Sequence, residues 1–206
     1  MLLKSKKILY KDWIYTWLLE KKDYIKESTY ANYSNNIFNH IIPKLGDYYL
    51  NELNHKVIQD FLLELSKNGR KDNTGGLAEK TIKDITIIIK GSIKKGINED
   101  KIKHIELTFN YPKDNKENKL YVLTKREQIK ITNYVLENIN SRNIGLLISV
   151  YSGIRIGELC ALRWEDVDFK KNCLTINKTI QRVYIKDKDK NISKVIITTP
   201  KTKNAN

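Results

Sequence analysis

The stretch from Ser152 to Asp168, SGIRIGELCALRWEDVD, contains an arginine that an ordinary amphipathic helix does not explain. Arg155 lies between two isoleucines directly after Gly153, and Glu158 follows three residues later. Residues three apart on a helix are neighbours, so the carboxylate can face the guanidinium. A guanidinium offers parallel N–H donors in a fixed geometry and stays charged at physiological pH, which suits phosphate oxygens. From these residues alone, a surface ion pair at a helix end is the simpler interpretation.

The composition favours a polyanionic partner without identifying it. The 206 residues include 38 Lys and Arg against 24 Asp and Glu, a formal net charge of +14. Residues 1–106 carry 19 basic and 14 acidic side chains, and residues 107–206 carry 19 and 10. Such an excess suits nucleic acid or an anionic membrane surface. A general bias of the source organism's proteins towards lysine would give the same net charge, so the charge alone does not identify the partner.

The sequence shows no pattern typical of a metal site, a disulfide scaffold or a membrane span. Its two cysteines, Cys160 and Cys173, lack CxxC spacing, and its three histidines are scattered. Cys160 falls in a helical apolar pattern and is interpreted as a small core residue. No apolar run is long enough for a signal peptide or a membrane span. We therefore expect a cytoplasmic protein with no cofactor, no metal and no membrane contact.

Residues 8–106 are predicted to form a bundle of four helices, over 8–22, 28–46, 54–69 and 78–97. Each carries an apolar stripe at helical spacing. Ser28 or Thr29 is the expected N-cap of the second helix, and Asn54 that of the third. Pro43 and Gly46 are expected to end the second helix. Trp13 and Trp17 are expected in the core of the bundle.

A polar, aperiodic segment over residues 107–120 is predicted to link this bundle to a second domain over 121–206. Thr124 and Glu127 form the S/T-x-x-E capping box of a first helix there. A second helix is expected to stop at Gly153, and a third to begin near Arg155 and to end before the EDVD segment. The period then changes to two over 173–183 and again over 193–200, which predicts a β-hairpin joined through a polar turn, KDKDKN.

The segment YSGIRIGELCALRWEDVDF resembles the first catalytic segment of the tyrosine recombinases, the phage integrase family. The shared pattern is T/S-G-x-R-x-G-E-L-x-x-L-x-W-x-D-x-D, and its fixed positions match Ser152, Gly153, Arg155, Gly157, Glu158, Leu159, Leu162, Trp164, Asp166 and Asp168. The upstream half is also similar to the core-binding domain of integrases from phages and conjugative transposons. The resemblance implies a mostly α fold with a small β-hairpin: a four-helix SAM-like core-binding bundle, a linker, and an incomplete α+β catalytic domain.

The resemblance implies site-specific integration or recombination of double-stranded DNA through a 3′-phosphotyrosyl intermediate, with self-association on DNA. Arg155 would stabilise charge on the scissile phosphate, and Glu158 would orient the site. A hairpin lysine, matched by Lys201 with Lys203 as the alternative, would protonate the leaving 5′ oxygen. Trp164 is instead interpreted as a core anchor. Asp166 and Asp168 are interpreted as residues that shape the turn into the strand.

The chain departs from the family pattern after the hairpin lysine. The family then uses a His/Lys-x-x-Arg motif, a further His or Trp, and the nucleophilic tyrosine, none of which is matched in these 206 residues. Tyr184 is the one tyrosine after Arg155, and it precedes Lys201, which is the wrong place for a nucleophile. Whether the chain is enzymatic is therefore open. The alternative is a catalytically inactive DNA-binding remnant or regulator that occupies recombination sites, and the DNA downstream of codon 206 would distinguish the two.

Overall fold

The computed structural model describes residues 7–112, 121–188 and 190–200, which divide into two compact units. The first unit contains residues 7–112 together with 184–188 and 190–193. The second contains residues 121–183 and 194–200. The long β-hairpin therefore contributes its tip to the first unit and its base to the second.

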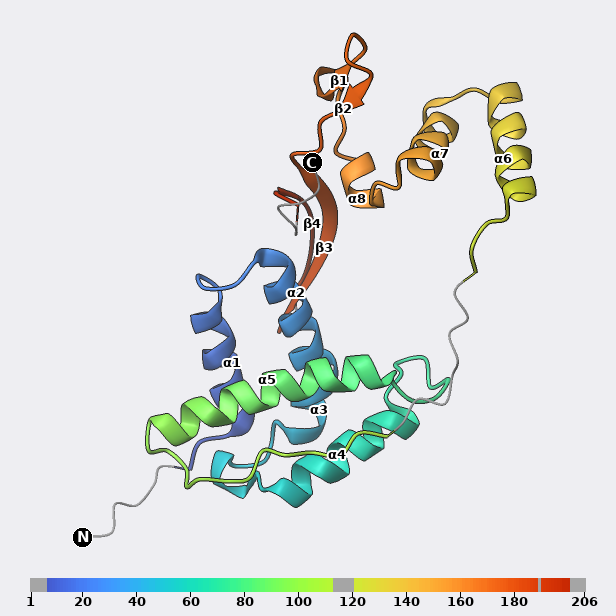
Figure 1. Cartoon of the computed structure of the whole chain (residues 1–206). Coiled ribbons are helices and arrows are strands. Elements are labelled where there is room, and N and C mark those ends of the chain that lie inside the picture. Colours follow the sequence, from blue (N-terminus) through green and yellow to red (C-terminus); the bar gives the residue numbers. More distant parts are fainter. Residues whose placement is uncertain (1–6, 113–120, 189, 201–206) are drawn as a thin grey trace. The chain divides into compact units, whose positions relative to one another are not determined.

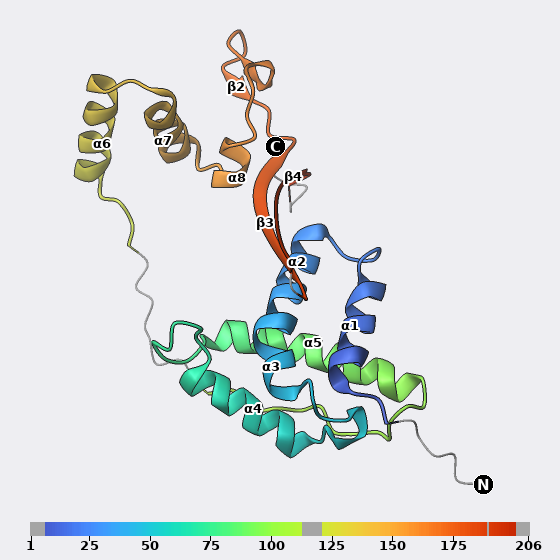
Figure 2. The ribbon, with the colours of Figure 1, turned by 180° about the vertical axis from the view of Figure 1, so that it is seen from behind.

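The four helical segments expected in the first unit are confirmed (Figure 1). The helices are α1 (Tyr10–Lys21), α2 (Glu27–Asn36) continued by a π-helical turn η1 (Ile37–Ile41) and α3 (Ile42–Leu45), α4 (His55–Asn68) and α5 (Glu79–Asn98). A short 3₁₀ turn, η2 (Leu50–Glu52), precedes α4. As Figures 1 and 2 show from opposite sides, the long helix α5 packs against α1, α2 and α4.

The second helical segment differs from the expectation at its start and in its middle. It begins at Glu27, and its N-cap Lys26 makes no side-chain capping hydrogen bond. Pro43 does not end the helix, although the helix does stop before Gly46. Proline has no N–H for the i→i−4 ladder, and the wider turn η1 lies directly before it. The helix thus passes Pro43 by a local change of pitch.

The core of the first unit is formed by the apolar faces of its helices. Helix α4 starts as predicted, because the side chain of Asn54 accepts a hydrogen bond from the Val57 amide at 3.0 Å. Trp13 and Trp17 are 7% and 4% exposed, which confirms their place in the core. The indole N–H of Trp13 donates to the Ser92 carbonyl at 2.9 Å, so its polar atom is satisfied inside the core.

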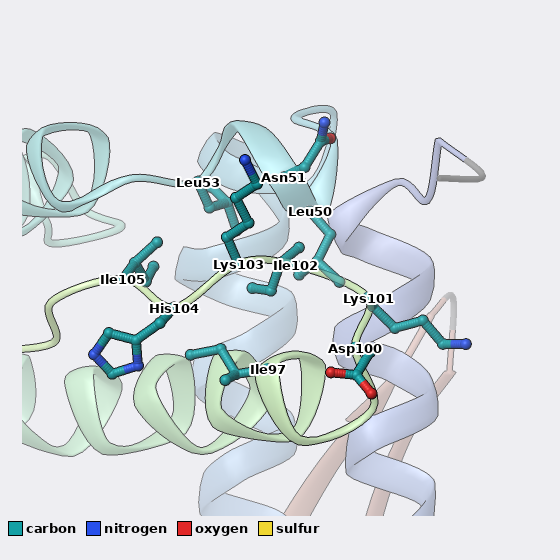
Figure 3. A pocket seen from close by; sticks show the side chains of 10 residues that line it. All are labelled: Leu50, Asn51, Leu53, Ile97, Asp100, Lys101, Ile102, Lys103, His104 and Ile105. Atoms are coloured by element: carbon teal, nitrogen blue, oxygen red, sulfur yellow. The ribbon is translucent and has the colours of Figure 1, made fainter. Parts of the chain in front are cut away.

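The segment after α5 packs back onto the first unit. Phe109 lies in its core at 6% exposure and stacks on His55, with ring centroids 5.2 Å apart. The beginning of the segment that the sequence predicts as a linker therefore belongs to this unit. Nearer to α5, Leu50, Ile97 and Ile102 line a cavity of about 640 Å³ (Figure 3).

The second unit contains helices α6 (Lys125–Glu137), α7 (Ser141–Ser152) and the one-turn α8 (Ile156–Leu159). The predicted capping box at the start of α6 is confirmed: the Glu127 carboxylate accepts from the Thr124 amide at 2.9 Å, and the Thr124 hydroxyl accepts from the Glu127 amide at 3.3 Å. Helix α7 ends as predicted at Gly153, which adopts φ +67°, a left-handed conformation that favours glycine.

The β-structure is divided more finely than the sequence pattern predicts. Strand β1 (Val167–Asp168) pairs antiparallel with β2 (Cys173–Leu174), with Val167 opposite Leu174. A separate two-stranded sheet pairs β3 (Thr179–Asp187) with β4 (Lys190–Thr198). The alternating run over 173–183 is thus broken between β2 and β3, and the hairpin turn is shorter than the predicted polar turn.

The described part of the chain contains no helix long and apolar enough to cross a membrane.

Candidate active site

Arg155 is placed by the junction between α7 and α8. Gly153 turns the chain at the end of α7, and two residues later Arg155 is the N-cap of α8 with an extended backbone (φ −71°, ψ 149°). The junction explains the arginine among isoleucines: its backbone begins a new helical turn, and its side chain is 63% exposed. The charged group therefore stays at the surface while the chain changes direction.

Arg155 and Glu158 are joined by two hydrogen bonds, as their spacing suggests. The Arg155 backbone N–H donates to Glu158 Oε2 at 2.9 Å, and Arg155 Nη1 donates to Glu158 Oε1 at 3.0 Å. The Glu158 side chain is only 4% exposed. One carboxylate thus fixes both the backbone and the guanidinium of the arginine, and most of the arginine side chain still faces outward.

The surroundings of Glu158 keep it ionised. The hydrogen bond from the Arg155 backbone N–H is the main cause that holds the pKa of Glu158 below its ordinary value of 4.5. Burial opposes this by raising the pKa, and the Arg155 guanidinium again lowers it. At neutral pH the pair is therefore a carboxylate that holds a guanidinium in place.

Gly157 allows α8 to lie against the start of β3. A Cβ atom added at Gly157 would be 2.5 Å from the Thr179 hydroxyl oxygen and 3.0 Å from the Ile180 carbonyl oxygen. These distances leave no room for a methyl group against the backbone of the strand. The glycine between Arg155 and Glu158 thus brings both residues next to the base of the hairpin.

The two aspartates of the motif shape turns, as predicted: Asp166 the turn that leads into β1, and Asp168 the turn that follows it. Asp166 Oδ2 accepts from the Arg163 amide at 2.8 Å, and Asp168 Oδ1 accepts from the amides of Lys170 and Lys171 at 3.0 Å each. The Arg163 amide is the main cause that lowers the pKa of Asp166, followed by Lys178. Sequence reasoning missed Lys178, whose Nζ lies 3.0 Å from Asp166 Oδ2. This ion pair, twelve residues apart, holds the segment between β2 and β3.

Two expectations about burial are wrong for the described structure. Trp164, predicted as a core anchor, is 84% exposed, and Cys160, predicted in the core, is also exposed. Both residues line an apolar cavity of about 610 Å³ formed by α7, α8 and the β1–β2 pair. Within the described second unit no element covers this face. The apolar spacing did not predict burial here, because burial depends on a partner surface. It also predicted too long a third helix, since α8 ends at Leu159 and not just before Glu165.

Lys201 and its alternative Lys203 lie outside the described residues. The structure therefore brings together Arg155 and Glu158 of the predicted site and does not place the hairpin lysine. Strand β4 ends at Thr198, three residues before Lys201. Chemically, the described part can bind an oxyanion through an oriented guanidinium.

Two family models match the chain in consecutive segments. Residues 9–66 match the N-terminal SAM-like domain of phage integrases, and residues 114–202 match the phage integrase family itself. The second segment contains both Arg155 and Glu158. The chain belongs to the phage integrase family. The SAM-like match covers the part of the first unit from α1 to most of α4, and it supports the mostly helical fold class predicted from the sequence.

Curated relatives in this family align over short segments. The chain is 37% identical over 60 residues to IntQ of Escherichia coli (strain K12), which is named as a defective protein. It is 42% identical over 60 residues to a tyrosine recombinase XerC-like protein of Caldanaerobacter subterraneus subsp. tengcongensis. Each alignment spans 29% of this chain and 15% of the relative.

Solved structures of integrases share the fold over nearly the whole chain. The Tn1549 transposon integrase, in complex with a circular intermediate DNA, superposes with a TM-score of 0.67 at 18% identity, over 95% of this chain and 58% of that one. The lambda integrase tetramer bound to a Holliday junction gives 0.62 at 21% identity, over 92% and 50%. The chain therefore spans 58% and 50% of the lengths of these two structural relatives.

Proposed function

We propose that this protein takes part in site-specific recombination of a mobile element, by breakage and rejoining of double-stranded DNA through a 3′-phosphotyrosyl intermediate. The observation that carries the proposal is the Arg155–Glu158 pair at the matching positions of the integrase motif. A nearly buried carboxylate orients an exposed guanidinium there, at distances of 2.9 and 3.0 Å. Such a preorganised cation suits the charge that develops on a scissile phosphate.

The roles follow from the chemistry of each side chain. Arg155 would contact the non-bridging oxygens of the phosphate, and Glu158 would position Arg155. Lys201, with Lys203 as the alternative, would donate a proton to the leaving 5′ oxygen. The 206 residues contain no match to the nucleophilic tyrosine, so we assign to them the binding and activation of DNA and leave the tyrosyl step outside them.

Double-stranded DNA is the partner that charge and fold together favour. Both halves of the chain are basic, and the solved integrases with this fold are bound to DNA. Two basic units joined by a connecting segment suit a clamp on a duplex. We also propose self-association on DNA, since the lambda integrase with this fold forms a tetramer on a Holliday junction. We place the protein in the cytoplasm, where such DNA is accessible.

Salt-dependent binding tests the proposed partner. If about six phosphates are contacted, the logarithm of the affinity for a short duplex should fall against log salt with a slope of about −5. Fluorescence anisotropy of a labelled duplex over a range of salt concentrations measures this slope. Absence of binding at low salt, or a slope near zero, would remove DNA as the partner.

A second function, occupation of recombination sites without catalysis, is favoured by one observation. IntQ, which aligns at 37% identity, is named as a defective protein. Both functions need DNA binding, so the slope does not separate them. Formation of a covalent protein–DNA adduct separates them, because a remnant or regulator would bind without forming one.

A further inference from the structure

A group of cations gathers around one amide oxygen on the first unit. Lys71, in the loop between α4 and α5, donates from Nζ to Asn39 Oδ1 at 2.6 Å. Lys186, in the part of the hairpin that belongs to the same unit, donates to the same oxygen at 3.0 Å. An amide oxygen carries no net charge, so it does not neutralise two ammonium groups.

Two neighbouring acidic side chains, those of Glu64 and Asp72, are engaged elsewhere. Glu64 pairs with Lys44 at 2.5 Å on the rim of the same cavity. Asp72, next to Lys71 in the chain, accepts from the amide and hydroxyl of Thr74 at 3.1 and 2.6 Å. The ammonium of Lys71 is therefore held beside a second cation, and the pKa of Lys71 is lowered by burial and then by Lys186.

The π-helical turn η1 carries Asn39, whose side-chain oxygen accepts from both lysines. Ile37 and Ile41 at its two ends are fully buried, while Asn39 and His40 between them are only partly buried. Asn39 and His40 line a cavity of about 150 Å³ together with Lys71, Lys44 and Glu64. π-turns inside helices are rare and often occur at functional sites.

The loop that carries Lys71 is ordered by its own hydrogen bonds. Arg70 donates from Nε to the Gly76 carbonyl at 3.1 Å, and its backbone N–H donates to the Gly75 carbonyl at 2.9 Å. Arg70 therefore spans the loop, which holds the adjacent Lys71 over η1. The cation is thus positioned before any ligand arrives, which reduces the entropy lost on binding.

We propose that Asn39, His40 and Lys71 form a seat for a phosphate group of the DNA backbone. A phosphate oxygen would place a negative charge beside Lys71 and Lys186, which the Asn39 amide oxygen does not provide. The Asn39 amide N–H and the His40 imidazole would supply further hydrogen-bond donors. The site lies on the first unit and is separate from the Arg155–Glu158 pair. It rests on the proposed function, because the phosphate is assigned to double-stranded DNA. As a backbone contact, the seat strengthens binding equally for all sequences.

Substitution of Lys71 tests the seat. In the 206-residue chain, Lys71→Ala should weaken binding to a short duplex of mixed sequence by roughly three- to tenfold at low salt, and should reduce the salt slope by about 0.9. Lys71→Arg keeps the charge and should retain the slope. The matched control is Lys11→Ala, because Lys11 already pairs with Asp47 at 2.9 Å and should contribute little. Circular dichroism checks that each variant is folded.

The pH dependence of DNA binding provides a second test of the site through His40, because a purely structural role of His40 would not change this dependence. Burial, and then the charge of Lys71, hold the pKa of His40 below its ordinary value of 6.5, so the free protein carries a neutral imidazole at pH 7. A phosphate beside it favours the imidazolium, so DNA binding takes up a proton and tightens as pH falls from about 7.5 towards 5.5. His40→Gln should flatten this dependence, and His104→Gln should leave it unchanged.

The outcomes separate this inference from the proposed function. If the unaltered chain binds the duplex but Lys71→Ala leaves affinity and slope unchanged, the seat is wrong and DNA binding stands. If inorganic phosphate shifts the NMR signals of His40 without competing with the duplex, the site serves a small anion and the DNA assignment is wrong. If the unaltered chain does not bind DNA at low salt, both proposals fail.

Discussion

At the residue scale, the central feature is how a single carboxylate arranges an arginine. Glu158 accepts from both the backbone and the guanidinium of Arg155, so the position of the side chain is tied to the backbone of the helix start. A glutamine could keep one acceptor but not the charge. The two residues are therefore held as one group, and we propose that Glu158 is a positioning residue.

The lowered pKa of Glu158 makes stability depend on pH. The carboxylate has a lower pKa folded than unfolded, so its stabilising contribution is complete above about pH 4.5 and is lost as pH falls through the folded value. We expect the unfolding free energy to fall in this acidic range and the fall to be smaller in Glu158→Gln. Urea titrations across pH 3–6 measure it. Equal pH dependence in both proteins would show that Glu158 is not held by Arg155.

The types and spacing of Arg155 and Glu158 were sufficient to predict their contact, because residues three apart at a helix start have few alternatives. The sequence could not predict the exposure of Trp164, which depends on whether another element covers it. It also missed the pair of Lys178 with Asp166, since their twelve-residue separation crosses two strands. Contacts between residues within one helical turn were thus predictable, and contacts between residues brought together by a turn of the chain were not.

At the element scale, capping residues and glycines determine where the helices begin and end. Thr124 with Glu127, Asn54 and Gly153 act at the positions that the sequence predicts. The π-turn η1 and the strand pair β1–β2 were not predicted. A π-turn leaves little trace in apolar spacing, and strands of two residues are too short for an alternating pattern.

Replacement of Gly157 tests how closely α8 approaches β3. Gly157→Ala places a methyl group 3.0 Å from the Ile180 carbonyl and closer to Thr179, so we expect a loss of about 1–3 kcal/mol in unfolding free energy. Chemical denaturation measures it. Thr179→Ala in the same chain should restore part of the loss, because it removes the nearer contact. A Gly157→Ala chain as stable as the original would contradict this packing.

Phe109 tests where the first unit ends. Its ring is 6% exposed and stacks on His55, so Phe109→Ala should cost about 3–5 kcal/mol in the unfolding of the first unit. Thermal unfolding followed by circular dichroism measures the loss, with the exposed Phe169→Ala of the second unit as the matched control. If Phe109→Ala unfolds like the original chain, residues 107–111 behave as a linker, as the sequence suggests.

At the scale of the whole molecule, we propose that two basic units bind one polyanionic partner. The first unit offers the lysines around Asn39, and the second offers the Arg155 guanidinium. In this proposal, contacts to the DNA backbone would position the protein, and the oriented arginine would stabilise charge at one phosphate. The motif at Arg155, together with the similarity of the upstream half, was enough to predict the family, and apolar spacing predicted the helices; the family models and the solved structures support both.

The formation of a covalent adduct tests the proposed role of Arg155 most directly. The substrate is a nicked duplex made from the DNA that flanks the coding sequence, which traps a phosphotyrosyl intermediate on a denaturing gel. The 206-residue chain should form no adduct, whereas a chain extended by a downstream segment with His-x-x-Arg and a tyrosine should form one. In the extended chain, Arg155→Ala should lower adduct formation by about 100-fold or more, and Tyr184→Phe should leave it intact. An adduct formed at the original rate by Arg155→Ala, or one from the 206-residue chain that is lost on Tyr184→Phe, would contradict the assigned site.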